Sequence, residues 1–255
     1  VPEYRFVRQD RPIGHAAETL RRGTEPTQPA DGRPTGAGPM DDLKASHMSQ
    51  CVDHSDPQHP PSGVGIPRHH EFDAAAFEKA VTDLLAACGI APDAAHMGRT
   101  AHRVRELWQQ RLLGGYDLDP ASALGEGFAD SRTDMVVIRG IAVHGVCPHH
   151  LVPFRGVAHV AYLPGGRLHG FGRIARMVDA IGHRFTYQEW MTRDIADALV
   201  AHGQAAGGAC VIEAEQLCLL LGEDRRGDER VVTQAFAGSF ADSPQLRNEF
   251  LHALK

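Results

Sequence analysis

The fold is decided by residues 135–166, which have the sequence MVVIRGIAVHGVCPHHLVPFRGVAHVAYLPGG. Met135–His144 is rich in β-branched residues, which favour strands. Gly156–Leu163 alternates in the manner of a strand and is predicted to be its partner. Gly165 and Gly166 then make a turn. A Cys-Pro-His-His segment follows directly on the first of these strands.

Pairs of helices and pairs of strands alternate on both sides of this stretch. Apolar periods of helical spacing cover 72–87, a segment capped by Asp93 that reaches about Leu113, and then 171–182, 189–202 and 244–254. Two further strands are expected at 209–221 and 230–240. This order predicts an α+β protein.

The composition changes before the first predicted helix. Residues 1–66 are rich in Pro, Gly, Asp, His and Arg and show no sustained apolar period, so we expect a disordered or weakly ordered arm. A helical region over 67–120 and a main domain over 121–255 are expected to follow.

The totals exclude several classes of protein. A net charge of -6 argues against a broad nucleic-acid surface, which needs a basic face. No stretch approaches the roughly 20 apolar residues that cross a bilayer, and the first residues form no secretory signal. The five cysteines are an odd count with irregular spacing, which does not suggest a disulfide framework. We therefore expect a cytoplasmic protein that binds neither nucleic acid nor membrane.

The Cys-Pro-His-His segment, residues 147–150, is a candidate metal site. A thiol and an imidazole within one turn can both reach Zn²⁺, which accepts such a mixture, and a catalytic zinc needs three protein ligands and one open position. Cys218 is the best candidate for the ligand from elsewhere, because its predicted strand lies beside the acidic segment 213–216 and the pair Arg225-Arg226. The alternative is that Cys218 is a small buried apolar residue, as we expect for Cys51, Cys88 and Cys210.

Residues 147–199 resemble the catalytic core of the GTP cyclohydrolase I family. The shared pattern is a Cys-x-His-His-hydrophobic-x-Pro-Phe-x-Gly run, then a Tyr-Leu-Pro turn, a helix with spaced cations and a Gln-Glu pair. Residues 100–104 are similar to the family's Thr-Pro-x-Arg-Val helix start, and the resemblance continues through 213–240. It therefore spans about residues 70 to 255 and leaves the arm outside.

The resemblance implies a fold, an assembly and a reaction. The fold is the tunnelling fold, with an antiparallel four-stranded sheet, helices on one face, and sheets of several subunits joined into a barrel. Residues 121–255 would be the catalytic domain, and the assembly would be a homodecamer with sites at subunit interfaces. The reaction converts GTP and water to formate and 7,8-dihydroneopterin triphosphate, towards tetrahydrofolate.

The resemblance also implies roles for individual residues. Zn²⁺ would be held by Cys147, His150 and Cys218. His149 would be the acid/base group, because a histidine titrates near working pH. Gln188 and Glu189 would hold the guanine edge. Arg173 and Arg176, at i and i+3 on one helix face, would share the triphosphate, unless they form only a solvated cationic face.

The sequence departs from the family at four places. Gln216 replaces a histidine at a catalytic position and cannot shuttle a proton. Gly222 replaces a phosphate-binding arginine, whose role Arg225 or Arg226 would have to take. Gly172-Arg173 replaces Ser-Lys, and Pro148 replaces Glu.

Three interpretations remain open. In the first, the chain is a GTP cyclohydrolase I in which His144 or His169 supplies the missing imidazole. In the second, it is a diverged paralogue that stops after ring opening or acts on a different purine-type substrate. In the third, it is an inactive subunit that binds a purine or pterin and regulates a partner.

Overall fold

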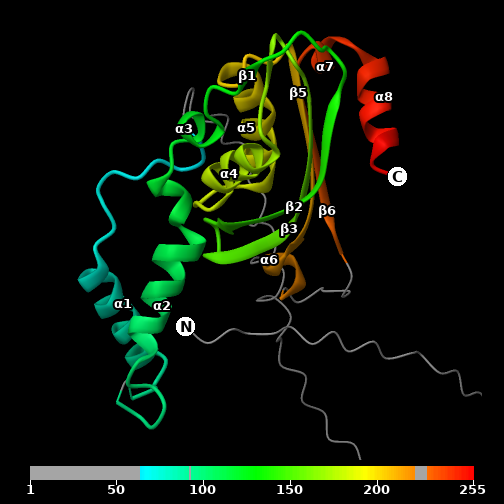
Figure 1. Ribbon diagram of the computed structural model, residues 1–255. Helices are drawn as coiled ribbons and strands as arrows, with labels where there is room; N and C mark the ends of the chain where they lie inside the picture. Colours follow the sequence, from blue (N-terminus) through cyan, green and yellow to red (C-terminus); the bar gives the residue numbers. More distant parts are fainter. Residues whose placement is uncertain (1–63, 92, 222–228) are drawn as a thin grey trace, which may run out of the picture. The chain divides into compact units, whose positions relative to one another are not determined.

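An antiparallel four-stranded sheet lies at the centre of the computed structural model, which describes residues 64–91, 93–221 and 229–255 (Figure 1). Its strand order is β2-β3-β5-β6. The strands are β2 (Val136–Cys147), β3 (Val152–Leu163), β5 (Gly207–Gln216) and β6 (Val231–Gly238). A small second sheet pairs β1 (Phe128–Ala129) with β4 (Arg167–Leu168). The α+β class and the antiparallel sheet predicted from the sequence are confirmed.

The hairpin β2–β3 lies within the stretch quoted first, and its strands are longer than predicted. Its register runs from Val136 opposite Tyr162 to Cys147 opposite Val152. A bulge interrupts it at Gly140, whose φ of 74° lies in the left-handed region that glycine tolerates. The Cys-Pro-His-His segment is therefore the turn of this hairpin, and it is closed by a hydrogen bond from Leu151 N to Cys147 O (3.0 Å).

Helices cover both faces of the sheet, which corrects the expectation of helices on one face. Side chains alternate along each strand, so that Val160 and Ile212 belong to one apolar cluster and Ala161 and Val211 to the other. The first face packs against α4 (Phe171–Gly182) and α5 (Gln188–Ala201), the second against α7 (Ser239–Asp242) and α8 (Pro244–Ala253) (Figure 1). The short segment 239–243 turns the chain after β6 and thereby carries α8 to the second face.

Phe240 is the centre of the smaller cluster and offers a test of it. Its side chain is fully buried, and its ring packs edge-on against Phe250 with centroids 6.2 Å apart. We expect Phe240→Ala to lower the free energy of unfolding by about 3–5 kcal/mol, because it leaves a large cavity. Urea unfolding measures this loss. Phe128→Ala, at a half-exposed ring, is the control, and an equal loss in both variants would contradict the assignment.

The N-terminal helices begin where local capping allows. Asp73 caps α1 (Ala74–Ala87) by accepting from Ala76 N. Asp93, predicted to cap the second helix, does not do so: turns run to Arg99, His96 has a φ of 73°, and α2 begins only at Thr100. The remaining helical segments of this region are α2 (Thr100–Leu107), a π-helical turn (Trp108–Leu112), a 3-10 turn (Gly114–Asp117) and α3 (Pro120–Leu124).

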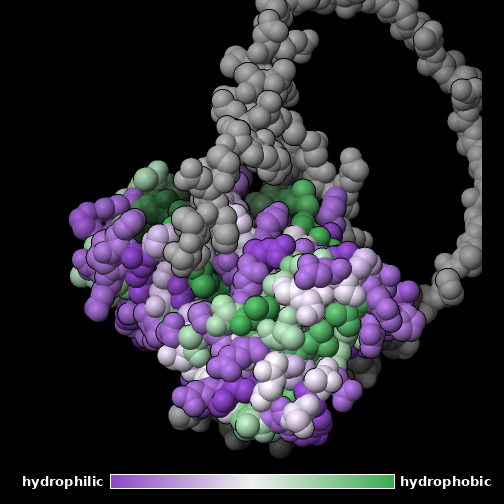
Figure 2. All heavy atoms as spheres, turned by 90° about the horizontal axis from the view of Figure 1, so that it is seen from above, coloured by the Kyte–Doolittle hydropathy of each residue, from purple (hydrophilic) through white to green (hydrophobic). Residues whose placement is uncertain are grey.

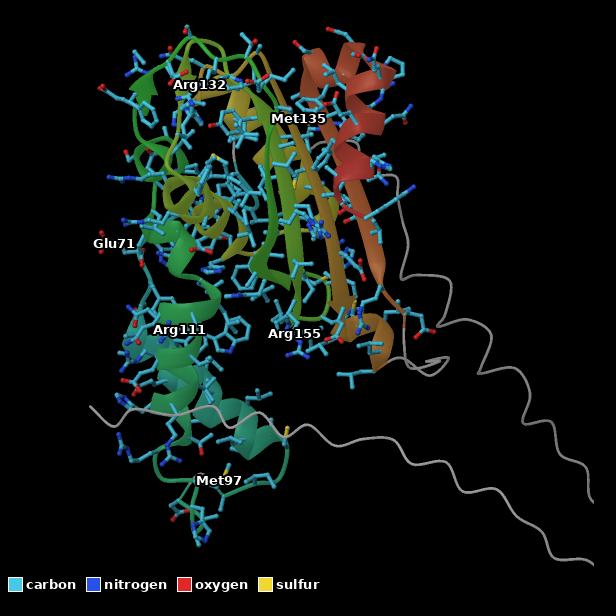
Figure 3. The ribbon with its side chains drawn as sticks, turned by 45° about the vertical axis from the view of Figure 1, so that its right-hand side comes forward. Glu71, Met97, Arg111, Arg132, Met135 and Arg155 are labelled. Carbon is cyan, nitrogen blue, oxygen red and sulfur yellow. The ribbon has the colours of Figure 1, made fainter. Side chains whose placement is uncertain are left out.

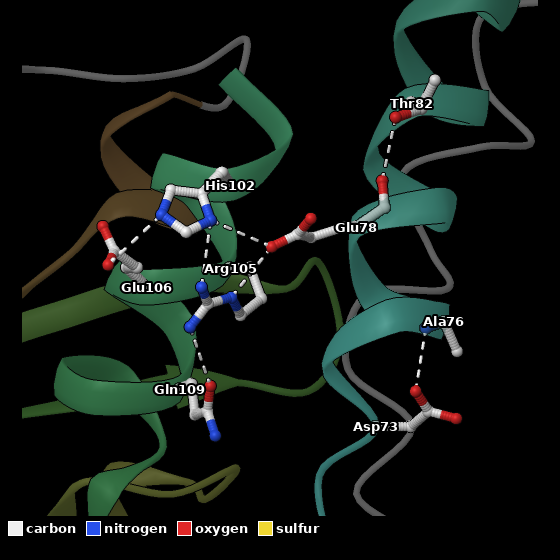
Figure 4. A network of polar contacts seen from close by, with 8 residues as sticks. All are labelled: Asp73, Ala76, Glu78, Thr82, His102, Arg105, Glu106 and Gln109. Atoms are coloured by element: carbon white, nitrogen blue, oxygen red, sulfur yellow. Dashed lines mark hydrogen bonds and ion pairs between the residues drawn. The ribbon is translucent and has the colours of Figure 1, made fainter. Parts of the chain in front are cut away.

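A polar network joins α1 to α2 (Figure 4). Glu78 Oε1 accepts from Arg105 Nε at 3.0 Å and lies 3.2 Å from His102 Nδ1. The hydrogen bond from Arg105 is the largest of the effects that lower the pKa of Glu78. The network fixes the pairing of two helices that bury none of their residues completely.

Contacts with the core are already made at Val64, within the stretch 1–66 that was predicted to be a disordered or weakly ordered arm. Val64 packs against the larger cluster, Gly65 N donates to Asp194 Oδ2 (3.3 Å) and Ile66 N donates to Phe185 O (2.9 Å). The rest of the predicted arm, residues 1–63, lies outside the described residues.

Large apolar side chains are exposed on several elements. Figure 2 shows hydrophobic residues gathered in patches between hydrophilic ones on the face seen from above. Apolar patches of this kind mark contact surfaces. In the described part of the chain, no helix is both long and apolar enough to span a bilayer. The exposed apolar residues are Leu84, Ile90, Leu107, Phe128, Leu151, Phe171, Leu219, Leu221 and Val232.

Candidate functional site

A pair of thiols lies at one end of the sheet. Cys147 ends β2, and Cys218 lies in the short helix α6 (Leu217–Leu220), which directly follows β5. The prediction of a strand through Leu221 is wrong, since β5 ends at Gln216. β3 lies between the two cysteine-bearing elements, and its residues Val152 and Phe154 pair with Cys147 and Gln216. Burial raises the pKa of the Cys218 thiol, and the adjacent Cys147 thiol, with which it interacts, raises it further.

Two histidines lie beside this pair on the hairpin turn. His149 and His150 are exposed, and their ring centroids are 6.4 Å apart. The Nε2 atom of His149 lies 3.2 Å from the hydroxyl of Tyr187, a hydrogen-bonding distance. Tyr187 is thus a further candidate site residue, and no motif in the sequence pointed to it.

The segment 184–187 explains how Tyr187 reaches the turn. It runs beside the end of β2, where Val146 N donates to Arg184 O (3.0 Å) and Thr186 N donates to Val146 O (3.1 Å). On its other side, the Arg184 guanidinium donates to Gly115 O (2.7 Å) and Leu118 O (2.8 Å). The same segment therefore contacts both the N-terminal helical region and the site.

The donors at the sheet end fit a zinc ion in their chemistry. Two thiols and a neighbouring imidazole are the ligands that Zn²⁺ prefers. Among residues 64–91, 93–221 and 229–255, no three His, Cys, Asp or Glu side chains are grouped as a metal site. The structure brings Cys147 and Cys218 together and places His150 on the same turn as Cys147, without completing a set of three.

The start of α5 lies beside the same turn. Glu189 is exposed in its first turn, while Gln188 is almost completely buried. The Gln188 amide nitrogen donates to two backbone carbonyls, Ile212 O (3.1 Å) and Val231 O (2.9 Å), and to the Thr233 hydroxyl (3.1 Å). Its amide oxygen accepts from Gln216 Nε2 at 2.6 Å. The polar atoms of Gln188 are therefore engaged within the chain.

The predicted phosphate-binding residues lie on two elements. Arg173 and Arg176 are both exposed on α4, one turn apart. Neither guanidinium has a hydrogen-bond or ion-pair partner among the described residues. Arg225, together with Gly222, lies outside the described residues.

A charged cluster borders the sheet end next to Gln216. Glu215 accepts from Arg155 Nε (2.9 Å) and pairs with Arg230 (2.7 Å). The Arg155 hydrogen bond is the largest effect that lowers the pKa of Glu215. Figure 3 shows Arg155 at this end of the sheet, with Met135 and Arg132 at the opposite end. Sequence spacing did not reveal this cluster, because its members come from three strands or their flanks.

The two histidines proposed to replace the missing imidazole lie elsewhere. His169 is buried at the opposite end of the sheet, where its backbone N–H donates to the Tyr162 hydroxyl, roughly 30 Å of strand from the hairpin turn. His144 lies three residues before Cys147 on β2 and is not part of the hairpin turn. The ring of His144 stacks on His183 with centroids 3.8 Å apart.

The stacked pair predicts how stability changes with pH. Burial is the main effect that lowers the pKa of His183 to about 4, and the neighbouring charges of His144 and Arg111 lower it further. The Oδ1 atom of Asp179 lies 3.6 Å from His183 Nε2. Between about pH 6.5 and about pH 4, His183 is protonated in the unfolded chain but neutral in the folded chain. The free energy of unfolding therefore falls as the pH drops from about 6.5 to about 4.

We expect His183→Gln to reduce the stability lost between pH 7 and pH 4 by about 1–2 kcal/mol, after allowing for partial exposure. Urea unfolding at a series of pH values measures this change. His252→Gln, at an exposed histidine of α8, is the control and should leave the pH dependence as in the unmodified chain. The same pH dependence in the unmodified chain and in His183→Gln would contradict the argument.

An open hollow of about 550 Å³ lies apart from the thiol pair. Glu126, Arg167 and His202 are among its lining residues. Arg167 lies just beyond the end of β3 that is farthest from the hairpin turn. We therefore place the candidate site at the thiols and histidines, where the reactive side chains gather, and not at this hollow.

Comparison with known proteins identifies the family of the chain. The family model described as GTP cyclohydrolase I matches residues 77–255. GTP cyclohydrolase 1 of Ralstonia nicotianae is 68% identical over 203 residues, which are 80% of this chain and 97% of the relative. GTP cyclohydrolase 1 of Chromobacterium violaceum is 70% identical over 190 residues, covering 74% and 92%. The protein of the same name from Mycobacteroides abscessus is 39% identical over 189 residues, covering 73% and 92%.

The fold and these relatives define an α+β hydrolase. The chain belongs to the GTP cyclohydrolase I family. The resemblance seen in the sequence is confirmed.

Proposed function

We propose that the chain opens the imidazole ring of GTP by hydrolysis, releasing formate and forming 7,8-dihydroneopterin triphosphate. The observation that carries this proposal is the Cys147–Cys218 thiol pair beside the His149 turn. The match with this chain covers nearly the whole length of relatives named GTP cyclohydrolase 1, which supports the same substrate.

Zn²⁺ is the cofactor of this proposal, with Cys147, His150 and Cys218 as its ligands. A zinc ion held by these residues would act as a Lewis acid that activates water at neutral pH. The thiols lie together and the imidazole shares the turn of Cys147, which supports this ligand set.

The chain's other residues bind the substrate and move protons. His149, held at its Nε2 by the Tyr187 hydroxyl, protonates a ring nitrogen of the purine next to the attacked carbon. Glu189, exposed at the start of α5, accepts hydrogen bonds from two N–H groups of the guanine edge. Arg173 and Arg176, whose guanidinium groups have no hydrogen-bond or ion-pair partner among the described residues, bind the triphosphate, and we retain Arg225 as a third cation.

The assembly proposed is a ring of copies with the tunnelling fold, of decameric size. β2 and β6 are the edge strands of the sheet, and an exposed edge readily pairs with another chain. The exposed apolar side chains of α1, α2 and α4 support further contacts between copies. Pairing of β2 with β6 of a neighbour would join the sheets into a barrel.

A second candidate function rests on Gln216. An amide stands where the family has a histidine, and neither His144 nor His169 lies where it could replace that imidazole. A paralogue that opens the purine ring and stops there, or that uses another purine-type substrate, would need fewer proton transfers.

Incubation of the zinc-loaded protein with GTP tests these proposals. Formate together with a fluorescent pterin after oxidation supports the full reaction. Loss of purine absorbance without a pterin, or turnover of another purine but not GTP, supports the second candidate. Binding of purines without any turnover would contradict both and would leave a regulatory subunit.

A further inference from the structure

The amides of Gln188 and Gln216 form a chain whose direction is fixed by the backbone. An amide side chain can be turned in two ways, and its hydrogen-bond partners decide between them. The Gln188 nitrogen faces Ile212 O and Val231 O, two atoms that only accept. Turning this amide would place its oxygen against two carbonyl oxygens. The oxygen of Gln188 must therefore face Gln216.

The orientation of Gln188 then decides that of Gln216. Because the Gln188 oxygen can only accept, Gln216 must present its nitrogen, and the two atoms lie 2.6 Å apart. The oxygen of Gln216 is turned away from Gln188 and has no donor among the described residues. Gln216 is partly exposed and directly precedes the helix that carries Cys218, whereas Gln188 is 2% exposed.

We infer that Gln188 is a positioning residue that holds the Gln216 amide with its oxygen towards the site, where this oxygen accepts a hydrogen bond from an N–H or O–H group of the reacting purine. The inference rests on the proposed function for the identity of the substrate. It gives Gln216 a defined role as an acceptor, in place of the proton shuttle that an imidazole would provide.

A matched set of variants tests the inference. Gln188→Met keeps the length of the side chain but frees the Gln216 amide, and Gln216→Leu removes the acceptor itself. We expect Gln188→Met to lower kcat about fivefold to tenfold, the equivalent of one hydrogen bond, with KM changed less than twofold. In the double variant, kcat should equal that of Gln216→Leu, because Gln188 acts only through Gln216.

Thr233→Val is the control. It removes one acceptor of the Gln188 nitrogen but leaves both backbone carbonyls, so the direction of the amides is kept. We expect a lower Tm with kcat unchanged. An equal loss of kcat in Thr233→Val and Gln188→Met, or multiplicative losses in the double variant, would overturn the inference.

Failure of the proposed function would appear differently, as absence of GTP turnover in the unmodified chain. In that case the Tm values of the unmodified chain, Gln188→Met, Gln216→Leu and the double variant decide whether the amides are coupled. The double variant should lose less Tm than the sum of the two single variants, and additive losses would overturn the inference.

Discussion

Replacing Cys218 by serine is expected to remove bound zinc and to lower GTP turnover by about a thousandfold or more, because a hydroxyl is a poor substitute for a thiolate ligand. Cys218 lies in α6, directly after β5, beside the Cys147 thiol at the end of β2, so its replacement leaves a single thiol at the site. Zinc content per chain, measured by atomic emission after dialysis, and formate release measure the two effects.

Cys88→Ser is the matched control for this variant. Cys88 was predicted to be a small buried apolar residue, but it is an exposed free thiol at the end of α1, outside the candidate site. Zinc content and turnover should both remain those of the unmodified chain. A Cys218→Ser protein that keeps one zinc per chain and full turnover would show that Cys218 is not a ligand.

Replacing His149 by glutamine is expected to lower kcat by about 10²- to 10⁴-fold while zinc content stays unchanged, because proton transfer by a positioned side chain contributes this much. The glutamine keeps a polar group near Tyr187 but cannot protonate the purine. Single-turnover measurement of formate separates this loss from a change in product release.

Tyr187→Phe distinguishes a chemical role of His149 from a structural one. It removes only the hydroxyl that lies 3.2 Å from His149 Nε2. We expect kcat to fall about tenfold, the value of one hydrogen bond that orients the imidazole. Equal activity of His149→Gln and the unmodified chain would contradict the assignment of His149.

The sequence predicts the parts of this molecule that depend on local pattern. Strands β2 and β3 follow from β-branched and alternating residues, and α4 follows from a regular apolar period that is buried as expected. Cys218 was expected on a strand because the apolar run continues past Gln216. In the structure β5 ends at Gln216, and the helix α6 begins at the next residue.

Other features depend on contacts between distant segments and leave no periodic trace. Tyr187 reaches His149 only because segment 184–187 lies beside β2. The position of α8 on the second face depends on the turn at Ser239–Asp242. The identity of Gln188 in the sequence does not show whether its amide contacts a ligand or two backbone carbonyls. Its burial follows from the packing of α5 on β5 and β6.

The segment 184–187 has a consequence for how changes spread through the protein. Arg184 is hydrogen-bonded to the backbone of residues 115 and 118, and the hydroxyl of Tyr187, three positions later, lies 3.2 Å from His149, the proposed proton donor. A substitution that shifts the N-terminal helical region is therefore expected to displace segment 184–187 and, through Tyr187, to change the orientation of His149. Loss of turnover in a truncation series of that region would reflect a misdirected proton donor, even where every removed residue lies far from bound GTP.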